Sequence, residues 1–484
     1  MPNDLIRLTA REAVARLRAK DITPLEMIDA AAARIAEVEP AVNALPTLCL
    51  DRARDHAKAL MRGERHEAEG EPGWLAGLPV AIKDLTEVAG VRTTFGSPIF
   101  ADHVPDRSHP IVERIERKGG VVIAKSNTPE FGAGGSTFNE VFGRTRNPWN
   151  TSLTCGGSTG GGAVALATGE VWLAHGSDHG GSLRRPATYC SVVGLRPSPG
   201  RVTRGAQEDL WSPLSVQGPM ARNIPDLALF LDTMAGWDID DPMTYDAPAR
   251  SYADAVAAAE REKPLRIAFT TDFGGALPMD REMREICARE VRRFESLGIA
   301  VEEIHPDLGA LNEAFLVLRS QHFVVDREEL LATKRDKLKP DIVWQTERGL
   351  AETPSRLAWA EHERARFFRA MRDTFATCDV LVTPGASTPA FDVMLRAPEK
   401  IAGQVLDNYM GGSLINAFAT LASCPAVAVP CGFDRYGRPV GLQVVAPPRR
   451  DARALQVAAL FEQLTGLDRM LPVDPKPGVV PPYE

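Results

Sequence analysis

The chain has 484 residues, enough to bury a large apolar core, and its formal net charge at pH 7 is −8. This charge argues against a general nucleic-acid binder, because phosphate contacts require clustered lysine and arginine. No run of 18 apolar residues is present, so we expect no membrane span and no membrane partner. Seven cysteines without a Cys-x-x-Cys pair indicate reduced thiols, and with no visible secretory signal we expect a cytoplasmic protein.

The first 60 residues have helical periodicity. Thr9 is a suitable N-terminal cap for a helix over Ala10–Lys20. Thr23, which is followed by a proline, begins a second helix that we expect to run through Glu37. The segment Gly63–Gly73 is polar and rich in glutamate, and it is predicted to be a surface loop.

From about residue 75, short apolar runs alternate with helical stretches, which predicts an α/β fold with a largely buried sheet. The predicted strands are Pro79–Ile82, Val121–Ala124, Val171–His175, Leu265–Phe269, Ala300–Ile304, Val380–Thr383, Ala426–Pro430 and Gly441–Val445. The predicted helices are Gly162–Ala167, Asp280–Leu297, several charged helices within about 310–375, and Ala452–Leu464. A turn at Asp434–Gly437 joins the last two strands as a hairpin, and the proline-rich tail from Pro472 is predicted to be irregular.

Two glycine-rich loops, 24 positions apart, each carry a serine: Ser158 within Gly156–Gly161, and Ser182 at the end of Asp178–Ser182. Glycine lets backbone N–H groups approach a bound oxygen closely. An oxyanion hole requires such fixed donors, aimed at the charge that forms on a carbonyl oxygen. In the second loop the candidate donors are the N–H groups of His179, Gly180, Gly181 and Ser182. The alternative is a plain glycine turn with a surface serine.

The first loop also matches the Gly-x-Ser-x-Gly pattern of a nucleophile elbow. On that interpretation Ser158 is the nucleophile and works with a histidine, for which His305, His322 and His362 are available. Neither loop ends in the Gly-Lys-Ser/Thr of a phosphate-binding loop. Cys155 precedes the first loop, and its thiol is either functional or a small buried filler.

Lys83 follows an apolar run that carries it toward the interior. A buried lysine without a fixed anion tends to lose its proton. Free lysine has a pKa near 10.4, so being half neutral at pH 8 costs roughly 3 kcal/mol. A neutral amine is a competent general base. The alternatives are a surface lysine and a lysine paired with Asp84, the next residue.

The three segments together resemble the amidase signature family. Gly77–Asp84 matches its Gly-x-Pro-x-x-x-Lys-Asp segment, Gly156–Gly161 its glycine-serine loop, and Ser177–Pro186 its Thr-Asp-x-Gly-Gly-Ser-x-Arg-x-Pro segment. Further segments that look like family segments, in family order, are Asn127–Phe131, Gly143–Trp149, Val193–Ser198 and Pro439–Gln443. The resemblance covers nearly the whole chain and is weakest at about 235–400.

The resemblance implies one domain over residues 1–484, with a large mixed central β-sheet sandwiched by α-helices. Within it we expect N-terminal helices at 1–60 and a catalytic core at about 70–230 and 375–465. A variable region at about 235–375 is expected to cover the substrate. The resemblance implies no cofactor and no metal.

Carried over residue by residue, the resemblance makes Ser182 the acylated nucleophile and Ser158 a bridging serine entered through a cis peptide after Gly157. Neutral Lys83 accepts the proton of Ser158, which in turn accepts that of Ser182. The residues expected to support the loops are Asp178, Arg184 and Thr159, the last standing where the family usually has a second serine. His179 is expected to act through its backbone.

The implied activity is hydrolysis of a small-molecule amide, aryl or alkyl, with carbamates and esters as possible substrates of the same chemistry. One alternative is the glutaminase subunit of a transfer-RNA-dependent amidotransferase, and another is a urethanase of the same family. A third is a non-enzymatic binding protein descended from the family, which the retained lysine and serines disfavour. Both a monomer and a homodimer are compatible with the sequence.

Substrate choice is expected to lie in the variable parts of the chain. The candidate substrate-binding residues are Gly132, Ala133, Gly134, Gly135 and Trp211. The small side chains of the first four leave room beside Ser182, and the indole of Trp211 can stack on an aromatic leaving group or simply pack. The regions 315–325 and Asn408–Asn416 are further candidates.

Overall fold

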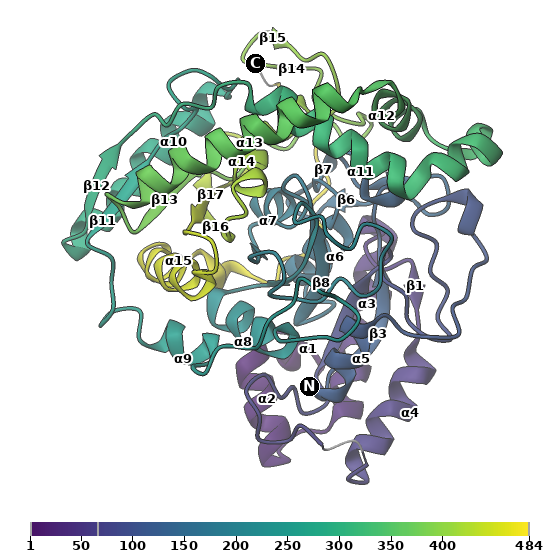
Figure 1. Ribbon diagram of the computed structural model, residues 1–484. Coiled ribbons are helices and arrows are strands. Elements are labelled where there is room, and N and C mark those ends of the chain that lie inside the picture. The colour runs from purple at the N-terminus through teal and green to yellow at the C-terminus, as the bar shows by residue number, and fades with distance from the viewer. Residues whose placement is uncertain (1, 65–66, 483–484) are drawn as a thin grey trace.

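The computed structural model describes residues 2–64 and 67–482. Of the loop predicted at Gly63–Gly73, residues 65–66 lie outside this range, and the others form turns, as predicted. In the predicted irregular tail, residues 483–484 lie outside the described range, and residues 472–482 form neither helix nor strand. Figure 1 shows α2 and α4 of the N-terminal part at the bottom of the view and α11 and α13 across its top.

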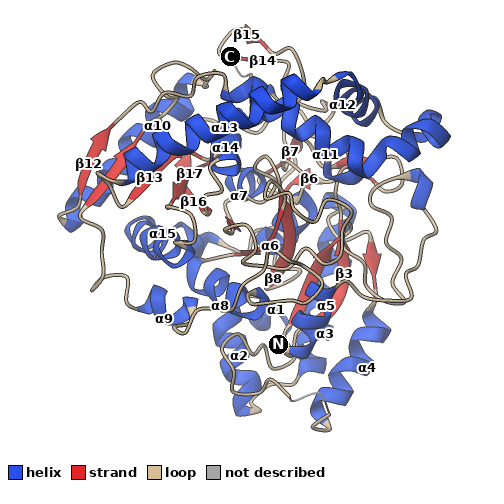
Figure 2. Ribbon diagram, viewed as in Figure 1, coloured by secondary structure: helices blue, strands red, loops and turns tan. Residues whose placement is uncertain are grey.

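A single sheet of eleven strands runs through the molecule (Figure 2), in the order β1-β3-β2-β8-β10-β9-β16-β17-β13-β11-β12. Its strands are β1 (Thr47–Leu48), β2 (Pro79–Lys83), β3 (Val121–Ser126), β8 (Leu173–Asp178), β9 (Val193–Arg196), β10 (Val216–Ala221), β11 (Arg266–Phe269), β12 (Ala300–Glu303), β13 (Val380–Pro384), β16 (Ala426–Phe433) and β17 (Pro439–Val445). The two-stranded pairs are β4 (Phe138–Asn139) with β5 (Gly143–Arg144), β6 (Arg146–Asn147) with β7 (Asn150–Thr154), and β14 (Lys400–Ile401) with β15 (Gln404–Val405).

Strand directions in the large sheet are mixed. β2 runs parallel to β3 and β8, whereas β10 is antiparallel to both of its neighbours. At the other end, β11 is parallel to β12 and β13, and β16 and β17 form the predicted antiparallel hairpin. The central strands are buried along most of their length. The expected α/β fold with a large mixed sheet flanked by helices is confirmed.

The helices are α1 (Pro2–Leu5), α2 (Ala10–Ala19), α3 (Pro24–Val42), α4 (Leu50–Met61), α5 (Pro110–Arg117), α6 (Gly160–Thr168), α7 (Arg184–Cys190), α8 (Ile224–Met234), α9 (Tyr252–Ala257), α10 (Arg281–Val291), α11 (Leu311–Lys334), α12 (Pro340–Ala351), α13 (Pro354–Phe375), α14 (Leu414–Leu421) and α15 (Asp451–Thr465). No helix in the described part of the chain is long and apolar enough to cross a membrane. α6 and α7 pack on each other and on the central strands, and α8, α9 and α15 form a second packed group.

The first two predicted helices begin where the sequence indicates, because each has a reciprocal capping box. Thr9 accepts from the N–H of Glu12, whose carboxylate returns a hydrogen bond to the N–H of Thr9. The same arrangement begins α3. α3 runs to Val42 and not to Glu37 as predicted, because its buried face continues beyond that point. α4 lies almost wholly within the region 1–60 that was expected to be helical, although the sequence prediction gave this helix no bounds of its own.

Two further predicted elements have other bounds in the structure, and one strand was not predicted. The strand predicted at Val171–His175 is β8, which continues through polar residues to Asp178. The helix predicted at Asp280–Leu297 is α10 followed by a 3-10 helix over Arg292–Leu297. β10 was not predicted, because Gly218 and Pro219 interrupt its apolar run. β8 and β2 are parallel neighbours, so their carboxyl ends meet at one edge of the sheet, where open α/β sheets bind ligands.

Candidate active site

Lys83 is the last residue of β2, and its side chain is fully buried. Its Nζ donates to Ser158 Oγ at 2.7 Å and to Thr159 Oγ1 at 3.0 Å. Two further contacts reach Ser177, at 3.1 Å to Oγ and 3.5 Å to the carbonyl oxygen. The apolar strand therefore delivers an amine directly beneath the first glycine-rich loop.

No carboxylate within the described chain forms an ion pair with Lys83. Asp84 is paired instead with Lys125 of β3, at 3.1 Å, and it also accepts hydrogen bonds from the N–H and hydroxyl of Thr94. Burial lowers the pKa of Lys83 to about 7, and the charge of Asp178 opposes this shift only in part. The amine is thus substantially neutral at neutral pH, as a general base must be.

The first loop joins β7 to α6 and contains a cis peptide bond between Gly157 and Ser158. α6 packs tightly under it because its first turn is made of glycines. A Cβ at Gly160 would lie 2.3 Å from Thr137 Oγ1, and one at Gly161 would lie 2.4 Å from the backbone nitrogen of Asn127. Larger residues would push the loop away from Lys83.

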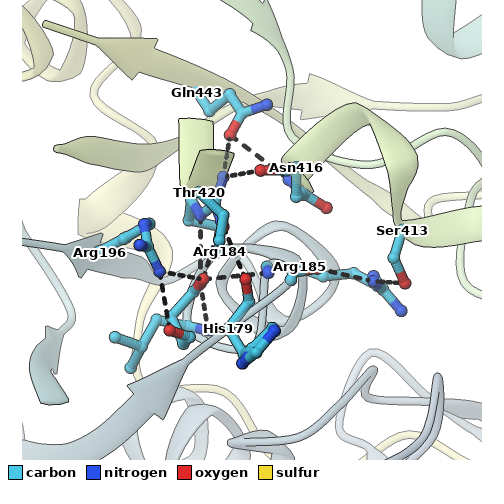
Figure 3. A network of polar contacts seen from close by, with 12 residues as sticks. His179, Arg184, Arg185, Arg196, Ser413, Asn416, Thr420 and Gln443 are labelled. Carbon is cyan, nitrogen blue, oxygen red and sulfur yellow. Dashed lines mark hydrogen bonds and ion pairs between the residues drawn. The ribbon is translucent and has the colours of Figure 1, made fainter. Parts of the chain in front are cut away.

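The second loop is held by the carboxylate of Asp178 at the end of β8 (Figure 3). It accepts from the N–H groups of Gly181 and Leu183, at 3.1 and 3.0 Å. Arg184 donates to both of its oxygens, and Arg196 lies 3.4 Å from one of them. Although burial raises the pKa of Asp178, the two guanidinium groups outweigh it and hold the pKa well below its usual range.

Among the predicted oxyanion donors, the Gly181 N–H is already bound to Asp178. The hydrogen bonds of the described residues include none from the N–H groups of Gly180 and Ser182. The two loops are joined because the N–H of Thr159 donates to the carbonyl of Ser182 at 3.1 Å. This contact places Ser182 next to the loop that carries Ser158.

Ser158 and Ser182 line the same cavity, whose volume is about 430 Å³. No hydrogen bond joins the two serine side chains in the described chain. Of the two contacts that a Lys83–Ser158–Ser182 relay needs, the structure therefore contains the one between Lys83 and Ser158. Gly132 borders the same point, because a Cβ there would lie 3.3 Å from Ser158 Oγ. The cavity also contacts His179, Gly180 and Gly134.

The cavity walls combine aromatic and cationic side chains. Phe95, Phe100 and Phe131 form an aromatic group on one side, with ring centroids of the neighbouring pairs 5.2 and 6.1 Å apart. The arginines of the wall are Arg185, Arg204, Arg319 and Arg327. α11 supplies two of these arginines, together with His322 and Phe323. This placement means that α11 covers the site.

Some residues predicted to bind substrate lie away from the cavity. Trp211 is 71% exposed and does not line it. Ala133 is buried in a small apolar cluster with residues of α11 and α12, and Gly135 lies against Ala397. The regions 315–325 and Asn408–Asn416 do reach the cavity, the second through Met410 and Ser413.

The nucleophile-elbow alternative requires a histidine beside Ser158, but the partner of Ser158 is Lys83. His322 is bound to Asp209 at 2.6 Å, and His305 lies near Thr270, where Nδ1 is 3.5 Å from Oγ1. The sequence analysis did not name Arg185 or Arg319 as cavity residues, although Arg319 lies within the candidate region 315–325. Arg185 had a local signal, since it adjoins Arg184 in the second loop segment, whereas the position of Arg319 depends on the packing of α11.

Three comparisons with known proteins agree on the family. The sequence profile of the family described as Amidase matches residues 26–455. The chain is 34% identical to an acylamidase of Rhodococcus erythropolis, over 94% of this chain and 95% of the relative. It is 35% identical to a glutamyl-tRNA(Gln) amidotransferase subunit of Moorella thermoacetica, over 97% of this chain and 99% of the relative.

Solved structures are also similar over nearly the whole chain. The crystal structure of a bacterial aryl acylamidase of the amidase signature enzymes matches with a TM-score of 0.87 and 25% identity, covering 96% of this chain and 98% of that one. The corresponding amidotransferase subunit from Thermotoga maritima matches with a TM-score of 0.69, covering 95% of this chain and 93% of that one. At 24% identity, the second match is evidence for the fold alone.

Proposed function

Because this chain belongs to the amidase family of amide-hydrolysing enzymes, we propose that it cleaves small carboxylic amides through an acyl-enzyme on Ser182. The observation that carries the mechanism is the 2.7 Å contact between Lys83 Nζ and Ser158 Oγ, made by a buried amine that has no carboxylate partner in the described chain. A lysine neutral near pH 7 accepts a proton from a hydroxyl, whereas a charged one only donates.

In the proposed reaction, Ser182 Oγ attacks the amide carbon while its proton passes to Ser158, whose own proton passes to Lys83. The negative charge that forms on the carbonyl oxygen is stabilised by backbone N–H groups of the His179–Ser182 segment. Among these, the N–H groups of Gly180 and Ser182 have no acceptor within the described chain. The protonated relay then returns a proton to the leaving amine as the C–N bond breaks. Water hydrolyses the ester on Ser182 by the same relay and restores the enzyme.

The substrate class is an aryl or alkyl amide of modest size. The cavity of about 430 Å³ is within the range of small-molecule sites, and its phenylalanine wall suits an apolar substituent. The similarity to acylamidases supports the same class. Carbamates and esters form the same oxyanion at Ser182, so we include them as further substrates.

A second candidate, the glutaminase subunit of a transfer-RNA-dependent amidotransferase, is favoured by one observation. The chain is as similar in sequence to such subunits, at 33 and 35% identity, as to the acylamidase, at 34%. That function requires partner subunits and a pocket for glutamine. It predicts that the isolated chain cleaves glutamine, or cleaves nothing until its partners are added.

The proposal is tested by turnover of an anilide, a primary amide, an aryl carbamate, an aryl ester and glutamine at pH 8. Ser182→Ala protein serves as the control, and a fluorophosphonate probe reports which serine reacts. Cleavage of the anilide or the primary amide, lost in Ser182→Ala, together with labelling of Ser182, supports the proposal. Labelling of Ser158, or cleavage of glutamine alone, contradicts it.

A further inference from the structure

Two of the four arginines that line the cavity have a carboxylate or several oxygen acceptors of the protein beside them. Arg204 donates to the carbonyl oxygens of Asp209 and Ser212, and to the side chain of Gln207. Arg327 lies 3.4 Å from the carboxylate of Asp326. These two guanidinium groups therefore have either a set of oxygen acceptors or a neutralising carboxylate.

Arg185 and Arg319 are different, because no carboxylate in the described chain lies within 4 Å of either guanidinium. Arg185 donates to the hydroxyl of Ser413 and, at 3.4 Å, to the carbonyl of Gly180. Arg319 donates to the hydroxyl of Tyr409 at 3.2 Å. The Nε of each is buried and has no hydrogen-bond partner among the described residues, a property that the Nε of Arg327 shares. Only 4% of Arg185 and 6% of Arg319 is exposed.

The two arginines border the same part of the site. Arg185 stands one helical turn after the nucleophile Ser182, and its guanidinium extends toward Ser413 (Figure 3). Gly180 of the nucleophile loop packs against Phe315, one turn before Arg319 on α11, and against Met410. Burial lowers the pKa of the Arg185 guanidinium. Tyr189 and the charge of Asp178 oppose this shift in part, and the charges of Arg184 and Arg319 add to it. Both guanidinium groups are thus buried and line the cavity that also contains Ser182.

Such an arrangement is costly without an anion, because a buried charge is normally paired and a buried N–H is normally bonded. A guanidinium presents a planar fork of donors that matches a carboxylate, and such charge-assisted bonds are about twice as strong as neutral ones. We propose that Arg185 and Arg319 bind a carboxylate group of the substrate, an inference that rests on the proposed function. The preferred substrate is then an amide that also carries a free carboxylate.

The same two charges disfavour an ammonium group near the bound carboxylate. Glutamine carries an ammonium on the carbon next to its carboxylate, so its ammonium would lie close to both guanidinium groups. Glutaramate, the monoamide of glutaric acid, is the same molecule without the ammonium. We therefore expect a higher kcat/KM for glutaramate than for glutamine, which also distinguishes this site from a glutamine pocket.

The test compares two matched pairs of amides that differ in the carboxylate. In the first pair, glutaramate carries the carboxylate on the acyl half of the amide, and pentanamide has a methyl group in its place. In the second pair, N-acetyl-β-alanine carries the carboxylate on the amine half, and N-propylacetamide has a methyl group in its place. For the wild type we expect kcat/KM about ten- to a hundredfold higher for the charged member of one pair. The pair that shows the preference identifies the half of the substrate that contacts the arginines.

The variants are Arg185→Met and Arg319→Met, with Arg327→Met as the matched control because Asp326 neutralises that guanidinium. We expect the ratio of kcat/KM between charged and neutral amides to fall about tenfold or more in Arg185→Met and in Arg319→Met. The same ratio should keep its wild-type value in Arg327→Met. Arg185→Lys keeps the charge and should retain part of the ratio if Arg185→Met does not fold. A wild type without this preference overturns the inference even if no variant folds.

Equal or lower kcat/KM for both charged amides in the wild type overturns the inference, and so does a ratio that is the same in all variants. If the wild type cleaves neutral amides at least as well as the charged ones and the probe labels Ser182, the carboxylate site fails while the proposed function stands. If Ser182→Ala cleaves amides as well as the wild type, the proposed function fails. Cleavage of none of the four amides overturns the carboxylate site, and it overturns the proposed function as well if the anilide is not cleaved either.

Discussion

Asp84 forms its ion pair with Lys125, at 3.1 Å, and not with Lys83, its neighbour in the chain. Successive residues at the end of a strand point to opposite sides, and the parallel strand β3 supplies Lys125 directly opposite Ile82. The carboxylate of Asp84, which is adjacent to Lys83 in the sequence, therefore neutralises Lys125 and not Lys83. Asp178 does act on Lys83, but that carboxylate is shared with Arg184 and Arg196.

The first prediction concerns the pH dependence of the reaction. Burial lowers the pKa of Lys83 to about 7, so the amine becomes neutral, and competent as a base, as the pH rises through that value. We expect kcat/KM to fall about tenfold per pH unit well below pH 7 and to level off above it. Initial rates of cleavage of a neutral amide between pH 5 and 9 measure this pH dependence. Circular dichroism at pH 5 and pH 9 checks that the protein stays folded.

Lys83→Ala is expected to lower kcat about 10²- to 10⁴-fold, the usual contribution of a general base. The fall of kcat/KM at low pH should disappear with it. A variant that keeps the wild-type pH profile would show that another group sets the profile.

The second prediction separates the two lysines at this end of the sheet. Lys125→Met leaves Asp84 buried without its cation, and breaking a buried pair typically costs about 3–5 kcal/mol. Urea unfolding at pH 8 should show that the free energy of unfolding falls by about this amount. In this variant kcat/KM should still level off above about pH 7, because the pKa of Lys83 depends on burial and on Asp178.

The double variant Asp84→Asn/Lys125→Met is the control for this loss. It removes both charges, so it should recover much of the stability lost in Lys125→Met. If the single and the double variant are equally unstable, the lysine acts through packing and not through its charge.

The sequence predicted the elements with strong local signals and missed those whose cause is distant. Thr9 and Thr23 mark helix starts by capping, and both starts are as predicted. β10 has Gly218 and Pro219 in mid-strand, and it is a strand because β8 and β9 pair with it on both sides. The paired residues lie 38 to 48 positions apart for β8 and 26 to 28 positions apart for β9, and pairing over such separations leaves no local pattern.

The same difference applies to the site. Lys83 and Ser158 stand in short motifs, so their sequence positions were evident, and the structure brings them to 2.7 Å. That Asp84 pairs with Lys125 and that Arg319 reaches the cavity both follow from the packing of separate elements. Trp211 looked suited to a substrate pocket because it is aromatic, but its loop carries it into solvent.

A third prediction concerns the carboxylate that organises the second loop. Asp178→Asn leaves Arg184 and Arg196 buried without their anion and weakens the bonds that orient Gly181 and Leu183. We expect a loss of about 3–5 kcal/mol in the free energy of unfolding and little remaining activity. Urea denaturation at pH 7 measures the first effect. Wild-type stability in this variant would mean that the arginines are satisfied by carbonyl oxygens alone.

A fourth prediction concerns Cys155, which adjoins the first loop. Its thiol is fully buried, and burial raises its pKa to about 12, as it does for Cys424. Since the thiolate is the reactive form, iodoacetamide at pH 8 should modify neither residue in the native protein, and activity should persist. Mass spectrometry of native and urea-unfolded samples measures this. Rapid modification of Cys155 with loss of activity would indicate a functional thiol.

The last prediction concerns the space beside Ser158. An alanine Cβ at Gly132 would lie 2.9 Å from Leu85 Cδ1 and 3.3 Å from Ser158 Oγ, so it displaces the relay. Gly132 has φ +71°, which costs a non-glycine residue about 1–2 kcal/mol. Gly437→Ala is a matched control, because its φ is +76° and nothing lies within 4 Å of the new Cβ. Both variants should lose similar stability in thermal unfolding, but only Gly132→Ala should lose kcat. A similar loss of kcat in both would mean that backbone strain, and not contact with Ser158, is responsible.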